Sequence, residues 1–234
     1  MPRGQPRLIA ALLRHGDYHQ RLDTPSAHQP FALTSEGQAQ AHRASTELDA
    51  ILTRELWRLH PVVDSSHMLR AWQTAEVMTG GLDDEDLEIE CFDEMAERCV
   101  GAAANMSQAE IRDVISSDPR YPSLPDGWKA DSHYRLPFQG AESLWQAGER
   151  LAGHLSKRME ELAEHARDDV VKLFVGHGAA FRHAVCHLGL LNLDEVAALS
   201  MYHAEPVFIE FMGPGKWRHI LGEWKQRNAD SNLD

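Results

Sequence analysis

Basic side chains stand at the ends of two expected strands. The apolar run over 8–13 is followed directly by Arg14 and His15, and the largely apolar stretch over 170–175 leads through Gly176 to His177, with a glycine after each histidine. A cationic guanidinium and two imidazoles can bind an anion, and a neutral imidazole can attack phosphorus. These residues therefore predict an anion site in which a histidine is a candidate nucleophile.

A third basic position, Arg70, stands near the start of an expected helix that follows a short strand over 61–66. Guanidinium groups match phosphate oxygens with paired hydrogen bonds and stay charged at any working pH. Backbone amides at the helix starts near residues 68 and 179 would add donors. If Arg70 lies close to the two strand ends that carry His15 and His177, the three side chains form a pocket for a dianion.

The elements that must position these groups follow from the hydrophobic pattern. Continuous apolar runs are typical of strands buried on both faces, as in parallel sheets, which bind ligands beyond the carboxyl ends of their strands. Alternating strands and helices indicate an α/β fold with three layers, a mostly parallel mixed sheet having helices on both faces. We expect strands over 8–13, 61–66, 87–92, 170–175, 204–211 and 216–224, and helices over 35–56, 69–79, 107–117, 144–162 and 179–190.

The chain shows no linker that would divide it, so we expect a single domain over 1–227. Four prolines crowd the end of a weakly patterned stretch, which predicts an insertion or lid over about 102–137. The acidic run over 83–86 is expected to be a solvated turn, and residues 228–234 a disordered tail.

Composition limits the classes of partner. The 234 residues carry a formal net charge of −13, which argues against non-specific binding of nucleic acid and against docking to anionic membranes. Three cysteines without metal-ligand spacing favour a reducing compartment, and the run over 8–13 is too short for a signal peptide or a membrane span. We therefore expect a cytoplasmic protein; its oligomeric state has no readable signal in the sequence.

Five short motifs stand in an order that resembles the histidine phosphatase superfamily, which contains the cofactor-dependent phosphoglycerate mutases. The resemblance runs from about residue 8 to residue 190 and so covers nearly all of the expected domain. The motifs are Arg14-His15-Gly16, Leu33-Thr34-Ser35-Glu36-Gly37, Ser66-x-x-x-Arg70-Ala71-x-x-Thr74-Ala75, Gly140-Ala141-Glu142-Ser143 and Val175-Gly176-His177-Gly178.

The resemblance implies a phosphoglycerate mutase-like fold and specific catalytic roles. His15 would be the phosphorylated nucleophile. Arg14, Arg70 and His177, together with Gly178, would form the phosphate pocket and stabilise charge on the transferring phosphoryl group. No metal ion and no other cofactor is implied.

The family also uses an acidic proton donor after the third strand, and two residues could supply it. The mutases carry a Leu-Asn-Glu-Arg pattern with a glycine four residues after the glutamate, and Met95-Ala96-Glu97-Arg98 with Gly101 resembles it. We therefore prefer Glu97 and keep Glu94 as the alternative. The group must give a proton to the leaving oxygen and then act as a base toward water.

Departures from the mutase pattern favour hydrolysis. Arg21 stands where the mutases carry an asparagine, and we place it among the phosphate-binding residues; Ala179 replaces another asparagine. No Arg-Arg pair that could hold a phosphoglycerate carboxylate occurs in the insertion. We expect a phosphomonoester hydrolase acting on a small phosphorylated metabolite or a phosphoprotein.

Three alternatives remain open. The first is a phosphoglycerate-type mutase, and the second is a non-catalytic module that binds a phospho-ligand or a protein. The third is a metallohydrolase, because Asp17 and His19 lie close to His15, and His183 and His187 are spaced one helical turn apart. Zinc sites need three or four ligands, so we expect no metal.

Overall fold

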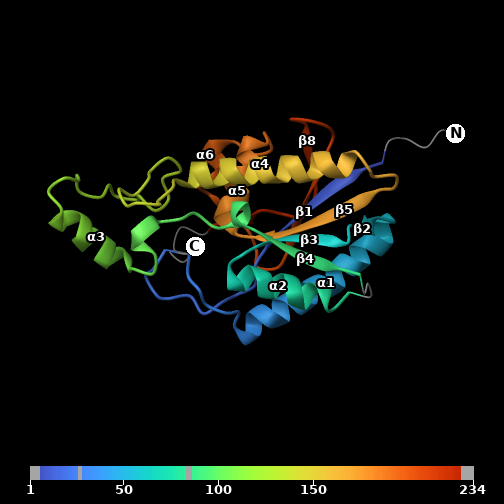
Figure 1. Ribbon diagram of the computed structural model, residues 1–234, viewed down its shortest axis with the longest axis horizontal. Coiled ribbons are helices and arrows are strands. Elements are labelled where there is room, and N and C mark those ends of the chain that lie inside the picture. Colours follow the sequence, from blue (N-terminus) through green and yellow to red (C-terminus); the bar gives the residue numbers. More distant parts are fainter. Residues whose placement is uncertain (1–5, 26–27, 83–85, 228–234) are drawn as a thin grey trace.

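The centre of the molecule is a mixed seven-stranded sheet with helices on both faces (Figure 1). The computed structural model describes residues 6–25, 28–82 and 86–227. The strand order is β4-β3-β5-β1-β7-β8, and β2 also pairs with β5. This arrangement confirms the expected α/β class. The strands are β1 (Leu8–Arg14), β2 (Arg58–Leu59), β3 (Val62–Ser66), β4 (Glu88–Phe92), β5 (Val170–Gly176), β7 (Pro206–Phe211) and β8 (Trp217–Leu221).

The register between β1 and β5 determines where the two strands end. They run parallel, and the pairing proceeds from Leu8 with Val170 to Arg14 with Gly176. On the other side of β5, β3 is also parallel, whereas β7 pairs antiparallel with β1. Because β1 and β5 end at the same level, the residues that follow them emerge side by side at the carboxyl edge of the sheet.

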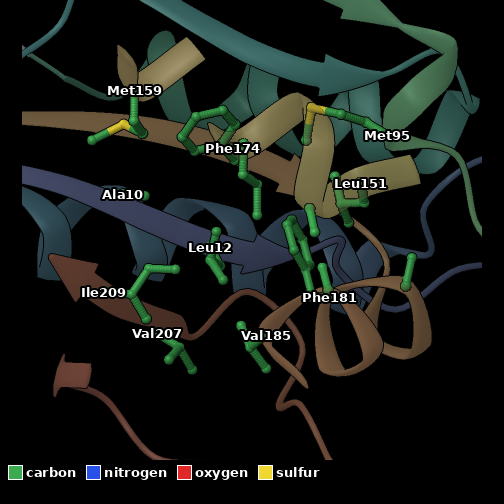
Figure 2. Packing of buried hydrophobic residues seen from close by; sticks show 14 of the residues in the cluster. Ala10, Leu12, Met95, Leu151, Met159, Phe174, Phe181, Val185, Val207 and Ile209 are labelled. Carbon is green, nitrogen blue, oxygen red and sulfur yellow. The ribbon is translucent and has the colours of Figure 1, made fainter. Parts of the chain in front are cut away.

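Helices cover both faces of the sheet because β1 is apolar on both sides. Ile9 and Leu13 pack in one cluster with α1 and α2. Ala10 and Leu12 pack in the other with α4 and α5, which is the cluster that Figure 2 shows. All seven residues of β1 are buried, as a continuous apolar run predicts. The helices are α1 (Ser35–Glu55), α2 (Leu69–Thr79), α3 (Gln108–Ser117), α4 (Leu144–Ala163), α5 (Gly178–His187) and α6 (Leu193–Val196).

The segment around α3 lies at one end of the molecule, away from the central sheet (Figure 1). Two 3₁₀ turns precede it, η1 (Asp93–Met95) and η2 (Gly101–Ala103). Apolar side chains of this segment pack mainly on one another and so form a third cluster. Its buried members are Val100, Ala103, Ile111, Ile115, Leu124, Trp128, Leu136 and Ala141.

The structure adds several short elements that the sequence pattern did not predict. These are β2, α6 and a separate two-stranded pairing of β6 (Leu199–Ser200) with β9 (Lys225–Gln226). Elements of two to four residues complete no period of hydrophobicity, so only their tertiary partners define them. The helix expected over 179–190 begins at Gly178 and ends at His187. Most of the acidic turn, at 83–85, and the tail over 228–234 lie outside the described residues.

Candidate active site

His15 follows β1 and is almost completely buried. Its Nδ1 lies 2.7 Å from the carbonyl oxygen of Gly16, and its Nε2 lies 3.0 Å from Nε of Arg70. A carbonyl can only accept and a guanidinium can only donate, so Nδ1 carries the proton and Nε2 presents its lone pair. Burial, followed by the positive charge of Arg70, holds the pKa of His15 well below 6.5. The ring is therefore neutral near pH 7, with Nε2 as its nucleophilic atom.

Arg70 contacts both His15 and His177. The guanidinium is fully buried, and while Nε donates to His15, one terminal nitrogen donates to Nδ1 of His177 at 3.2 Å. The other terminal nitrogen donates to the carbonyl oxygen of Gln29 at 3.0 Å. The central guanidinium carbon of Arg70, Cζ, lies 4.4 Å from the centre of the Tyr18 ring, within cation–π range. The orientation of this charged group is thus determined on every side.

His177 follows β5 and stands directly before the first turn of α5. Because Nδ1 accepts from Arg70, the proton of the neutral ring is on Nε2, which donates to Oγ of Ser66 at 2.9 Å. Burial is the main cause that holds the pKa of His177 well below 6.5. The ring centres of His15 and His177 are 5.1 Å apart. The two histidine motifs therefore meet, as their positions after neighbouring strands predict.

Three residues spaced four apart connect the motif around α2 to the site. Ser66 accepts from His177, and Arg70 donates to His15. Thr74 accepts from the amide of Gly16 at 3.0 Å and donates to the carbonyl of Arg70 at 2.7 Å. Ser66 and Thr74 belong to a predicted motif but had no predicted role; their regular spacing within that motif was the signal that could have identified them.

Arg14 lies beside the first turn of α5. One terminal nitrogen donates to the carbonyl oxygen of Met201 at 2.8 Å. A Cβ on Gly178 would lie 3.1 Å from Cδ of Arg14, so the glycine permits this close approach. His203, which the sequence analysis also missed, donates from Nδ1 to the carbonyl oxygen of His15 at 2.7 Å. No local motif marks His203, because it reaches the site only through the fold.

A cleft of about 380 Å³ opens at this edge of the sheet. Arg14 and His15 line it, together with both ends of the chain's central insertion. Five lining side chains are cationic and two are acidic, so the cleft is locally basic although the whole chain is acidic. Local charge of this kind favours an anionic ligand. The charged lining residues are Arg14, Asp23, Glu97, Arg98, Lys129, Arg182 and Arg227.

The structure separates the two candidate proton donors. The carboxylate of Glu97 lines the cleft and is mostly buried, accepting from the amide of Arg98 at 2.8 Å and from the amide of Ala179 at 3.2 Å. The side chain of Glu94 is exposed, and its carbonyl accepts from Arg150 at 2.6 Å. Only Glu97 of the pair lies among the lining residues of the cleft.

Arg21 is not brought together with the other predicted phosphate ligands. Its side chain is exposed and donates to the carbonyl oxygen of Asn105 at 2.9 Å, while Gln20 beside it lines the cleft. The amide of Arg21 donates to the side chain of Gln29 at 3.0 Å. The loop after β1 therefore turns the side chain of Arg21 toward the insertion instead of into the cleft.

Two further observations concern metals and membranes. In residues 6–25, 28–82 and 86–227, no three His, Cys, Asp or Glu side chains gather in a way that could hold a metal ion. Within the same residues, every helix is too short or too polar to cross a membrane.

Comparisons with known proteins bear on the family and the fold of the chain. A model of the histidine phosphatase superfamily (branch 1) matches residues 10–221. Among solved structures, a mycobacterial glucosyl-3-phosphoglycerate phosphatase is 20% identical over 92% of this chain and 96% of its own, with a TM-score of 0.64. The alpha-ribazole phosphatase from Shigella flexneri is 18% identical over 91% and 95%, with a TM-score of 0.68. At identities of 20% and 18%, the structural likeness to these two proteins shows a shared fold and nothing more. No curated protein sequence matches the chain significantly.

Proposed function

The chain belongs to the histidine phosphatase superfamily, and we propose that it is a phosphomonoester hydrolase that works through a phosphohistidine on His15. The observation that carries the proposal is the state of His15. Its neutral imidazole has the proton on Nδ1, and its Nε2 lone pair is next to the buried guanidinium of Arg70 in a basic cleft. This arrangement provides a nucleophile and charge stabilisation for a phosphoryl group.

In the first proposed step, Nε2 of His15 attacks phosphorus and the bond from phosphorus to the ester oxygen breaks. Glu97 gives its proton to the departing oxygen. Arg14 and Arg70 donate to the phosphoryl oxygens, and His177 completes the pocket. When the phosphoryl group binds, the Nε donor of Arg70 moves from the His15 lone pair to an oxygen of the substrate, which frees the nucleophile.

In the second proposed step, water attacks the phosphohistidine. The carboxylate of Glu97 takes a proton from this water, phosphate leaves, and the bond from phosphorus to Nε2 breaks. His15 and the protonated Glu97 are then restored. Glu97 thus acts as the general acid in the first step and as the general base in the second.

We place a small phosphorylated metabolite ahead of a phosphoprotein as the substrate. Two proteins of similar structure, the glucosyl-3-phosphoglycerate phosphatase and the alpha-ribazole phosphatase, are named for small substrates. We also propose that the segment over 102–137 is a specificity insertion of a single domain, since Gln108, Lys129 and Ser132 line the cleft. The three free cysteines suit the cytoplasm.

The test is detection of the covalent intermediate. Wild-type enzyme quenched in base after incubation with p-nitrophenyl phosphate should carry one phosphoryl group on the peptide that contains His15. His15→Ala should abolish both the phosphoenzyme and turnover. His19→Ala, which changes an exposed histidine four residues away, should retain both. Turnover by His15→Ala would refute the proposal.

The superfamily also contains mutases, so phosphate release must be compared with transfer. A mutase would need a bisphosphate to keep its histidine phosphorylated and would return the phosphoryl group to an acceptor. We expect inorganic phosphate as the product, with no stimulation by added 2,3-bisphosphoglycerate. Stimulated transfer between positions of a phosphoglycerate would instead support the mutase.

A further inference from the structure

Ser132 of the insertion and His183 of α5 meet in the wall of the cleft. Both side chains line it, and Oγ of Ser132 lies 3.0 Å from Nε2 of His183. Neither residue has a role in the phosphohistidine mechanism, and neither belongs to one of the five sequence motifs. A serine and a histidine from distant parts of the chain therefore form a polar pair in the cleft that His15 and Glu97 also line.

The direction of this hydrogen bond follows from the second nitrogen of the imidazole. Nδ1 of His183 lies 2.8 Å from the carbonyl oxygen of Ala179, which can only accept. Nδ1 therefore carries the proton of the neutral ring, and burial lowers the pKa of His183 to about 4, so the ring is neutral near pH 7. Nε2 must accept, and the single hydroxyl proton of Ser132 is used by this bond.

We infer that Ser132 is a specificity-determining residue that accepts a hydrogen bond from a hydroxyl or amino group on the leaving group of the phosphate ester. With its proton committed to His183, Ser132 offers the cleft only lone pairs. The geometry points to sugar or polyol phosphates as the substrate class, and His183 is the positioning residue. The inference rests on the proposed phosphatase function.

The pair is held rigidly, as recognition of one donor requires. A Cβ on Gly148 would lie 2.4 Å from Cβ of His183, so this glycine lets α4 and α5 pack closely at the histidine. The carbonyl of Ser132 accepts from the amide of Trp145 at 2.8 Å. The side chain of Asp131 accepts from the two backbone amides that follow Ser132. Such preorganisation reduces the entropy lost when a substrate binds.

The experiment compares matched esters with and without hydroxyl groups. The first series is glycerol 1-phosphate, erythritol 4-phosphate and glucitol 6-phosphate; the second is propyl, butyl and hexyl phosphate. The readout is the ratio of kcat/KM within each matched pair. Wild-type enzyme should prefer at least one hydroxylated ester, and Ser132→Ala should lower that ratio by roughly tenfold.

Variants of His183 distinguish recognition from a structural role. His183→Phe removes the acceptor and frees the Ser132 proton, so it should also lower the ratio. His183→Gln restores an acceptor oxygen near the Nε2 position and should recover much of it. Ser123→Ala, at an exposed serine in the same insertion, serves as the matched control and should leave the ratio unchanged. Thermal unfolding of each variant shows whether the fold is retained.

The outcomes separate the two proposals. An active wild type whose ratio is the same in folded Ser132→Ala overturns the inference and leaves the phosphatase function standing. A lower ratio in Ser132→Ala and His183→Phe, recovered in His183→Gln, supports it. A wild type that hydrolyses p-nitrophenyl phosphate but prefers no hydroxylated ester over its matched alkyl ester overturns the inference alone. A wild type that hydrolyses neither p-nitrophenyl phosphate nor any ester of the two series overturns both.

Discussion

Nε of Arg70 lies 3.0 Å from Nε2 of His15, the atom that the proposed reaction joins to phosphorus. Arg70 comes from α2 and His15 from the end of β1, 55 residues apart in sequence. The same guanidinium reaches His177, so one buried cation is shared by both histidine motifs. A single side chain therefore donates to a ring nitrogen of each histidine, and in the proposed reaction it would also supply positive charge to the phosphoryl group.

Replacement of this cation with lysine should be costly. Arg70→Lys keeps the charge but loses the planar fork, so His15 and His177 cannot both be contacted. We expect kcat to fall about 10²- to 10³-fold, as when one donor to a developing anion is removed. Steady-state kinetics with p-nitrophenyl phosphate measure this. Arg54→Lys, on the exposed side of α1, is the matched control. A loss below threefold would contradict the role of the fork.

The proton donor can be identified from the dependence on the leaving group. Glu97→Gln cannot protonate the departing oxygen, so hydrolysis of an alkyl phosphate should fall by about 10²-fold or more. p-Nitrophenolate leaves without a proton, so formation of the phosphoenzyme from p-nitrophenyl phosphate should fall much less. Single-turnover rates for the two esters give the comparison. The same change at exposed Glu94 should leave both rates near wild type; the reverse pattern would assign the role to Glu94.

Stability should depend on pH through His183. Its pKa is lowered to about 4 in the folded protein but is near 6.5 in the unfolded chain, so the unfolded state takes up the proton first as pH falls. The contribution is fully present above about pH 6.5 and is lost as pH falls toward 4. From pH 6.5 to 5 the free energy of unfolding should lose about 2 kcal/mol through this group.

Urea unfolding at pH 7 and pH 5 measures that loss. His183→Gln should remove about 2 kcal/mol of the difference between the two pH values, because its side chain does not titrate. His219→Gln, at an exposed histidine of β8, should change the difference little. An identical difference in wild type and His183→Gln would show that the buried ring is not the source.

A buried charge cluster centred on Asp64 of β3 should contribute to folding stability more than to catalysis. Asp64 is fully buried and lies 2.6 Å from Nζ of Lys172, with Arg158 and His154 also on its carboxylate. Asp64→Asn leaves the buried Lys172 ammonium without its counter-charge. We expect the free energy of unfolding to fall by about 3–5 kcal/mol.

Urea denaturation of Asp64→Asn at neutral pH gives this value. Asp168→Asn serves as the control, because Asp168 forms an exposed pair with Arg58. Exposed pairs contribute roughly 0–1 kcal/mol, so the control should lie close to wild type. Equal losses of unfolding free energy in Asp64→Asn and Asp168→Asn would show that the buried Lys172 ammonium does not depend on Asp64 for its counter-charge.

The sequence by itself determined the main strands and helices, and the strand ends at which catalytic side chains could stand. The apolar run before Arg14 and His15 and the strand before His177 predict buried parallel strands with basic side chains at their carboxyl edge. The motif order identified the superfamily, which the family match over 10–221 confirms. These features are local, because periodicity and turn residues act over one element at a time.

Tertiary structure decided which side chains meet. The register of Arg14 with Gly176 brings the histidines together, and a turn of the loop after β1 carries Arg21 away from them. The contacts of His203 with His15 and of Ser132 with His183 join segments more than 50 residues apart, as Thr74 joins α2 to Gly16. Such distances depend on how strands pair and helices pack, and no local pattern in a single sequence records them.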